Sequence, residues 1–206
     1  MKVEHYVVGV VGTNCYFAIN EATKECLIID PGDNADALEE KIRQGGLTPA
    51  AILLTHGHFD HIMGVEGLKE AFQIPVYVHE DDEEMLRRSD LNAGAMIGAR
   101  VSVTADELLH DGDELNLAGM KIEVLHTPGH TPGGVCFYFP EEEVLFSGDT
   151  LFCESVGRTD LPGGSMGALM RSIKERVLKL PDLTVVYTGH GEPTQIGSEK
   201  RNNPFL

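Results

Sequence analysis

The chain has 206 residues, of which 42% are hydrophobic and 24% are charged, and its formal net charge at pH 7 is −17. This length and composition predict a single globular domain, residues 1–206, with a full hydrophobic core. The strong negative charge argues against nucleic acid or an anionic membrane as a partner, because phosphate groups bind to basic surfaces.

Strands and helices alternate along the first half of the chain. Runs of β-branched and apolar residues predict strands at 3–11, 14–19, 25–29, 50–54 and 76–78. Helices are predicted at 34–44, which ends at two glycines, and at 62–72, where Ile62, Val65, Leu68 and Phe72 share one face. Residues 80–105 predict a mixture of helix and loop.

The second half follows the same alternation. Four more strands are predicted, at 120–125, 135–139, 144–146 and 184–187. Between the last two lies a helix with an apolar stripe, capped by Ser165 and ended by Pro181; the stripe consists of Met166, Leu169, Ile173, Val177 and Leu180. Strands interleaved with helices predict an α/β or α+β domain whose helices lie outside its sheets.

The stretch at residues 55–61, T-H-G-H-F-D-H, places three histidines and an aspartate directly after a predicted strand. His56 and His58 are two residues apart in extended backbone, so they point the same way and can hold one ion. Asp60 and His61 lie at the start of the next helix and can face a second ion. The stretch therefore predicts a metal site.

Three further strands end in glycine-rich turns that offer ligand-type residues. The ligand-type residues are His130 in H-T-P-G-H-T-P-G, Asp149 in S-G-D-T and His190 in T-G-H-G. If the strands lie side by side, these turns meet at one edge, where sites are usually built. Local hydrogen bonding would explain any one of these histidines, but a shared site explains five at strand ends better.

The ligand set consists of five histidines and two aspartates, without a thiolate. Nitrogen and carboxylate ligands suit zinc, iron or manganese, and zinc is our first expectation. Seven ligands exceed the need of one tetrahedral ion. They fit two divalent ions that share a bridging carboxylate and leave a position open for water, as catalytic sites do.

These residues resemble the metallo-β-lactamase fold superfamily, whose signature is T-H-x-H-x-D-H, and the resemblance covers essentially the whole chain. It implies a four-layer αββα sandwich. It also implies one ion held by His56, His58 and His130, a second held by Asp60, His61 and His190, and Asp149 as the bridge.

Within this superfamily, the segment after Asp149, L-F-C-E-S-V-G-R-T-D-L-P-G-G, looks most like the glyoxalase II (hydroxyacylglutathione hydrolase) group. The ending N-P-F-L is similar to that of the short bacterial form, which lacks the C-terminal glutathione-binding domain. In full-length enzymes a tyrosine that contacts glutathione follows the last histidine ligand by two residues, whereas this chain has Glu192. Arg158 falls at a basic glutathione contact and is the expected substrate-binding residue.

The resemblance implies hydrolysis of a small-molecule thioester, S-lactoylglutathione or a related hydroxyacyl thioester, by a metal-bridging hydroxide. Asp60 and Asp149 are the expected catalytic residues, as ligands that orient the water. A thiolate leaves readily, so no separate proton donor is needed.

Three alternatives stay open. A persulfide dioxygenase with a single iron also has G-R-T-D after the bridging aspartate, and lactone, lactam or other ester hydrolases share the fold. A non-catalytic scaffold is the third. We find no segment apolar enough to span a membrane and no secretory signal, so we expect a cytoplasmic protein. The sequence leaves the oligomeric state open.

Several other residues are expected to be structural. The four cysteines form no Cys-x-x-Cys pair and are predicted to be buried small hydrophobes: Cys15, Cys26, Cys136 and Cys153. His126 is predicted to be structural or to support a ligand, and His79 and His110 to be surface or hydrogen-bonded residues. His5 has no evident partner, and the acidic run 80–84 is predicted to be a solvated helix start.

Overall fold

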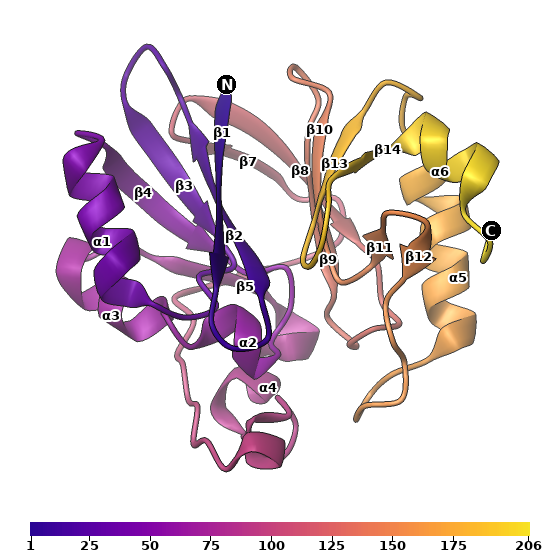
Figure 1. Ribbon diagram of the computed structural model, residues 1–206, viewed down its shortest axis with the longest axis horizontal. Coiled ribbons are helices and arrows are strands. Elements are labelled where there is room, and N and C mark those ends of the chain that lie inside the picture. Colours follow the sequence, from indigo (N-terminus) through magenta and orange to yellow (C-terminus); the bar gives the residue numbers. More distant parts are fainter.

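The computed structural model describes all 206 residues. Two six-stranded sheets face each other, with helices on both outer faces (Figure 1). The helices α1 and α3 cover one sheet, and α5 and α6 cover the other. This arrangement is the four-layer αββα sandwich, so the predicted fold class is confirmed.

The first sheet has the order β1-β2-β3-β4-β5-β6, antiparallel from β1 to β3 and parallel from β3 to β6. Its strands are β1 Lys2–Val8, β2 Thr13–Ile19, β3 Glu25–Ile29, β4 Thr48–Leu53, β5 Val76–His79 and β6 Glu107–Leu109.

The second sheet has the order β14-β13-β10-β9-β8-β7, in which only β10 and β13 pair in parallel. Its strands are β7 Glu114–Leu117, β8 Met120–His126, β9 Val135–Phe139, β10 Val144–Gly148, β13 Val185–Thr188 and β14 Thr194–Gln195. A separate two-stranded ribbon follows β10 and consists of β11 Leu151–Phe152 and β12 Ser155–Val156.

Six α-helices and three short 3₁₀ helices complete the structure. The α-helices are α1 Ala35–Gln44, α2 Phe59–Ile62, α3 Val65–Phe72, α4 Glu83–Arg87, α5 Met166–Glu175 and α6 Ile196–Asn202. The 3₁₀ helices are η1 Glu80–Asp82, η2 Gly94–Ile97 and η3 Val177–Lys179. None of the helices combines the length and apolarity needed to cross a membrane.

Strand β2 shows why the sandwich has four layers. All seven of its residues are buried, although side chains alternate between the two faces of a strand. Cys15, Phe17 and Ile19 join the core under the helices of the first sheet. Tyr16 and Ala18 join the core between the sheets, together with aromatic residues of the second sheet such as Phe137 and Phe146. A strand buried on both faces must lie between two layers.

The predicted helix at 62–72 is wrong in its first turn, since the structure has two helices, α2 and α3, that meet at Gly64. The N–H of Gly64 donates to the carbonyl of Pro31 at 2.8 Å instead of continuing the α2 ladder. A Cβ at this position would lie 2.7 Å from the same carbonyl oxygen, so a glycine permits the approach. The break frees α2 to present Asp60 and His61 separately from α3.

Two other predicted elements are too long. The helix α5 ends at Glu175, and Val177–Lys179 form η3 with hydrogen bonds three residues back, because Leu180 is extended before Pro181. The first strand ends at Val8 rather than at residue 11, because Gly9 has a φ of +66° and begins the turn to β2.

The remaining expectations had mixed outcomes. The short strands β6, β7, β11, β12 and β14 and the helix α6 were not predicted from the sequence. Residues 80–105 contain η1, α4 and η2 joined by loops, as expected. Of the four cysteines, three are buried, but Cys153 is exposed because it lies in the turn between β11 and β12.

Candidate metal centre

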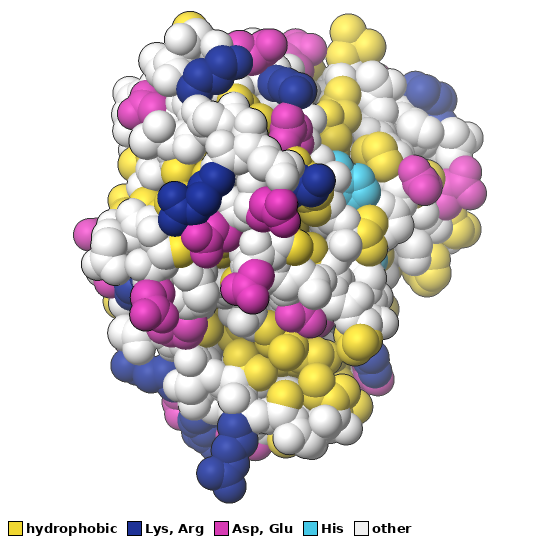
Figure 2. Space-filling model, turned by 60° about the vertical axis from the view of Figure 1, so that its left-hand side comes forward, with side chains coloured by type: hydrophobic (Ala, Val, Ile, Leu, Met, Phe, Trp, Pro, Cys, Tyr) yellow, Lys and Arg dark blue, Asp and Glu magenta, His cyan; other side chains and the backbone are white.

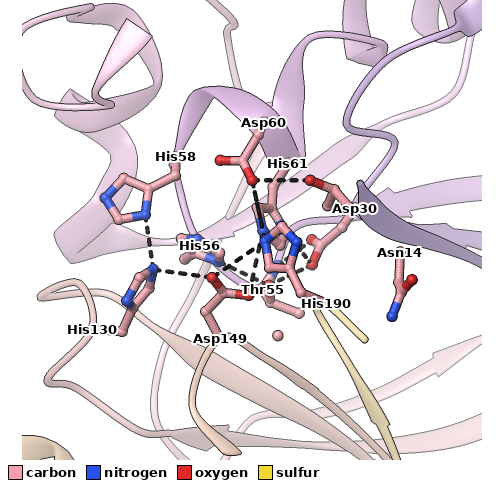
Figure 3. A network of polar contacts seen from close by, with 12 residues as sticks. Asn14, Asp30, Thr55, His56, His58, Asp60, His61, His130, Asp149 and His190 are labelled. Carbon is pink, nitrogen blue, oxygen red and sulfur yellow. Dashed lines mark hydrogen bonds and ion pairs between the residues drawn. The ribbon is translucent and has the colours of Figure 1, made fainter. Parts of the chain in front are cut away.

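All seven residues that the sequence singled out as ligands lie together at one end of the two sheets (Figure 3). The first sheet contributes the segment that runs from the end of β4 through α2. The second sheet contributes the loop between β8 and β9 and the ends of β10 and β13. The site therefore lies where strand ends of both halves of the sandwich meet.

The first cluster consists of His56, His58 and His130, all buried. One ring nitrogen or more from each lies within 4.8 Å of the others. Nδ1 of His58 is 2.9 Å from Nε2 of His130. Three buried imidazoles at this spacing match the donor set of a single ion.

The second cluster consists of Asp60, His61 and His190. Oδ2 of Asp60 lies 3.2 Å from Nε2 of His190 and 3.6 Å from Nε2 of His61. The hydroxyl of Thr13 donates to the same oxygen at 2.9 Å and fixes the carboxylate. These three side chains can hold a second ion.

Asp149 lies between the two clusters. Its Oδ2 is 3.5 Å from Nε2 of His130 in the first cluster and 3.6 Å from Nε2 of His190 in the second, and its Oδ1 is 3.5 Å from Nε2 of His61. A Cβ on Gly189 would overlap Oδ1 of Asp149, so a glycine lets the end of β13 pass this close. The carboxylate can therefore reach both clusters.

Hydrogen bonds to Nδ1 turn the Nε2 atom of four rings toward the centre. Nδ1 of His56 lies 3.1 Å from Oγ1 of Thr55, and Nδ1 of His61 lies 2.9 Å from Oδ2 of Asp30. Nδ1 of His130 lies 2.8 Å from the carbonyl oxygen of Arg158, and Nδ1 of His190 lies 3.3 Å from that of Gly12. The carbonyls and the carboxylate can only accept, and the Thr55 hydroxyl already donates to Asp30 at 2.6 Å. Nδ1 therefore carries the proton and Nε2 keeps its lone pair for a metal.

The charges around the rings differ between the two clusters. Burial lowers the pKa of His56 well below its usual value and that of His58 to about 3, with neighbouring histidines adding to the effect. For His61, burial also favours the neutral ring, but the carboxylates of Asp60, Asp149 and Asp30 outweigh it and raise its pKa to about 10. One half of the site is thus held neutral, and the other is rich in negative charge.

The residues fit a metal centre by a test independent of the sequence pattern. Three of their polar atoms that face the centre are buried and have no hydrogen-bond partner: Nε2 of His56, Nε2 of His61 and Oδ1 of Asp149. Buried polar atoms are nearly always paired, and each unpaired one needs an explanation. Cations bound between these atoms would explain why the atoms have no hydrogen-bond partner. The donors are imidazole and carboxylate, which suits zinc, iron and manganese.

Asp30 supports this centre and was missed in the sequence. It is buried at the end of β3, and it accepts hydrogen bonds from the N–H and hydroxyl of Thr55 and from His61. A signal was present, since Asp30 begins D-P-G-D after a predicted strand, as the ligands follow theirs.

Asp82 was also missed, and the prediction that the acidic run 80–84 is solvated is wrong for this residue. Asp82 is fully buried. Its two carboxylate oxygens accept from the N–H of Gly57 at 3.0 Å and the N–H of Gly133 at 2.6 Å. These glycines lie in the loops that carry His56 and His58 on one side and His130 on the other. Asp82 thus joins two loops from different sheets.

The remaining histidines lie outside the centre. The rings of His79 and His126 stack with centroids 4.0 Å apart, His126 bonds to the carbonyl of Pro132, and with Asp81 the two rings form a separate group of possible ligands. His79 is buried, and its Nδ1 accepts from the Asp81 N–H. His110 is exposed. His5 does have partners, since it bonds to Asn14 and stacks on Tyr16.

A pocket of about 540 Å³ opens over the centre and is lined by residues of both halves of the sandwich. Five of the seven ligand residues line it, together with Arg158 and several apolar side chains. The guanidinium of Arg158 pairs with both carboxylate oxygens of Asp160, at 2.7 and 2.8 Å. Glu192 is exposed and does not line the pocket.

Comparison with known proteins agrees with this geometry. Residues 8–190 match the Metallo-beta-lactamase superfamily. The chain is 42% identical over 208 residues to the probable metallo-hydrolase YqgX of Bacillus subtilis, covering 100% of this chain and 98% of that one. It is 37% identical over 212 residues to the hydroxyacylglutathione hydrolase GloC of Haemophilus influenzae, with the same coverage.

Solved structures give the same picture. The B3 metallo-beta-lactamase BLEG-1 superposes with a TM-score of 0.96 at 43% identity, covering 100% of this chain and 99% of that one. TTHA1623 in a di-iron-bound form gives 0.89 at 42% identity, with coverage of 98% and 100%. ETHE1 from Myxococcus xanthus gives 0.81 at 30% identity, with coverage of 99% and 84%.

Proposed function

The chain belongs to the metallo-beta-lactamase superfamily, and on that basis we propose that it is a two-metal hydrolase of S-lactoylglutathione or a related hydroxyacyl thioester. The observation that carries the proposal is the position of Asp149, whose carboxylate lies within 3.6 Å of histidines of both clusters. The similarity to a hydroxyacylglutathione hydrolase over the full chain supports the thioester as the substrate.

His56, His58 and His130 would hold one ion, Asp60, His61 and His190 the other, and Asp149 would be shared between them. Two divalent ions bound by these residues would lower the pKa of a water and would supply positive charge to stabilise an oxyanion. Zinc fits these donors, and the di-iron form of TTHA1623 makes iron an equal candidate for this chain.

The protein side chains provide orientation. Thr13 holds the carboxylate of Asp60, and Asp30 holds the rings of His61 and, through Thr55, His56. Fixed ligands keep the attacking water and the carbonyl group of the substrate in one geometry, which lowers the entropy cost of the reaction. Asp60 and Asp149 act in this way, and neither needs to take up a proton.

The leaving group explains why the pocket has no dedicated proton donor. A thiolate has a conjugate-acid pKa of about 8.5 and departs near neutral pH without full protonation. Arg158 lies on the rim of the pocket and can bind a carboxylate of the thiol arm when it releases Asp160.

A second candidate is the persulfide dioxygenase reaction, favoured by the segment Gly157–Asp160, G-R-T-D, after the shared aspartate. Hydrolysis of a β-lactam is a third, given the similarity to BLEG-1. The three reactions differ in their products and in their need for oxygen.

One experiment separates them. Purified protein is analysed for metal content and assayed with S-D-lactoylglutathione, with a glutathione persulfide under oxygen monitoring, and with a chromogenic cephalosporin. We expect two ions per chain and thioester hydrolysis that exceeds the other two rates. Oxygen uptake with one iron per chain would contradict the proposal.

A further inference from the structure

The two sides of the pocket differ in chemistry. On the side of the second sheet, residues 152–161 bring Arg158 and Ser155 to the rim, together with the apolar side chains of Phe152, Val156 and Leu161, so this side is mixed. On the side of the first sheet, the wall between the metal centre and solvent is entirely apolar, and we call it the apolar wall: Val11, Phe59, Ala93, Met96 and Ile97. Its residues come from the β1–β2 turn, the start of α2, and η2 with the residue before it.

Three residues of the apolar wall are open to solvent. Met96 is 71% exposed, and Val11 and Ile97 are each 50% exposed. A smaller cavity of about 130 Å³ shares Val11, Phe59 and Ile97 with the main pocket and extends the wall toward Val10 and Met63. Figure 2 shows hydrophobic side chains forming a continuous area on the lower part of one face. Single exposed apolar residues need no explanation, but contiguous ones beside a pocket indicate a binding surface.

The two sides of the pocket also differ in positive charge. Arg158 is the only lysine or arginine that lines the pocket. A thioester has two arms, and the charged groups of a peptide-like thiol require a cation. The thiol arm therefore lies toward Arg158, which leaves the acyl arm on the opposite, uncharged side.

Building on the proposed thioester hydrolysis, we propose that the apolar wall binds the acyl arm and that the preferred substrates carry an apolar acyl chain several carbons long. Burial of the acyl chain against the apolar wall removes apolar surface from water, which strengthens substrate binding by up to about fourfold per fully buried methylene. A short hydroxyacyl group such as lactoyl uses little of the wall. Its thioester binds weakly for that reason.

Binding can be measured without hydrolysis. S-methyl-, S-butyl- and S-hexylglutathione are thioethers that lack the carbonyl group, and calorimetry on the metal-loaded protein gives a Kd for each. We expect the Kd to fall about two- to fourfold per methylene. In the double variant Met96→Ser, Ile97→Ser this gain should shrink to less than half, while the Kd of S-methylglutathione stays unchanged.

A matched control is Leu183→Ser. Leu183 is 68% exposed, like Met96, but it precedes β13 whereas His190 follows that strand, so it lies at the far end of the sheet. The control should keep the full chain-length dependence. A Kd independent of chain length, or a double variant that keeps the whole gain, would overturn the apolar subsite.

Acyl thioesters of glutathione with increasing chain length separate the proposed hydrolysis from the proposed apolar subsite. Turnover of hexanoylglutathione with a lower KM than lactoylglutathione supports both. Hydrolysis without any dependence on chain length removes the subsite but leaves the hydrolase. A chain-length gain in thioether binding without turnover of any thioester supports the subsite and contradicts the proposed reaction.

Discussion

Oδ2 of Asp30 lies 2.9 Å from Nδ1 of His61. The carboxylate can only accept there, so the proton of the neutral ring stays on Nδ1 and Nε2 faces the proposed metal site. The same carboxylate accepts from the N–H and hydroxyl of Thr55, and that hydroxyl accepts from His56. One buried aspartate thus sets ring orientation in both clusters.

Asp30→Asn should weaken metal binding by about 10- to 100-fold, the usual effect of losing a group that orients a ligand. The asparagine NH₂ must face either the Thr55 N–H, which cannot accept, or the Thr55 hydroxyl and Nδ1 of His61, which could accept only by giving up the hydrogen that each now donates. Competition with a chromogenic chelator measures the affinity. Asp36→Asn, exposed on α1, is the control and should leave it unchanged.

Asp82→Asn should loosen the first cluster in particular, because only one of its two oxygens could still accept from Gly57 or Gly133. We expect about tenfold weaker binding of one ion, with the other ion little affected. The metal-free protein should also lose about 1–3 kcal/mol of stability through the unpaired N–H. Asp90→Asn, an exposed aspartate that follows α4 and pairs with Arg88, is the control. Equal weakening of both ions in Asp82→Asn would contradict the assignment to one cluster.

Metal loading should release protons. In the metal-free site His61 has a pKa of about 10, because three carboxylates outweigh the opposing effect of burial, so its ring is protonated at pH 7. The ion needs the neutral ring, and affinity should therefore fall about tenfold per unit as pH drops below 10.

At lower pH the fall should steepen, because burial of His190 is outweighed by its contacts with Asp60 and Asp149, which raise its pKa above the usual 6.5. Calorimetric titration in buffers of different ionisation enthalpy counts the released protons. A pH-independent affinity between pH 6 and 9 would show that His61 is not a ligand.

Arg158→Ala should raise KM for S-lactoylglutathione about two- to fivefold with kcat little changed, because it removes binding common to the ground and transition states. Asp160→Asn should lower KM, since it frees the guanidinium that Asp160 now holds. Arg43→Ala is a matched control, because Arg43 is similarly exposed and pairs with Glu39 on α1. A larger effect on kcat than on KM would place Arg158 elsewhere in the mechanism.

The clustering of the seven predicted ligands could be foreseen because the signal is local. Three histidines and an aspartate in T-H-G-H-F-D-H follow one strand, and the other ligands each follow a strand of their own. Strand ends converge in a sheet, so the sequence indicated the cluster before any geometry was known.

Support from Asp30 and Asp82 was not predictable in the same way. Asp82 is one of several carboxylates in E-D-D-E-E, and its partners lie 25 and 51 residues away in the chain. Nothing local distinguishes it from its solvated neighbours until two sheets come together. The apolar wall was not predictable for the same reason, since Val11 and Met96 line one pocket only in the folded protein.

The shared carboxylate of Asp149 is the central feature of this account, and metal content measured together with thioester hydrolysis tests it most directly. Asp149→Ala is compared with His110→Ala, an exposed histidine outside the centre, by elemental analysis and by turnover of S-D-lactoylglutathione. We expect Asp149→Ala to lose at least one of two ions and at least 100-fold in kcat/KM, with His110→Ala unchanged in both. Two ions and equal activity in both variants would contradict the shared-carboxylate centre.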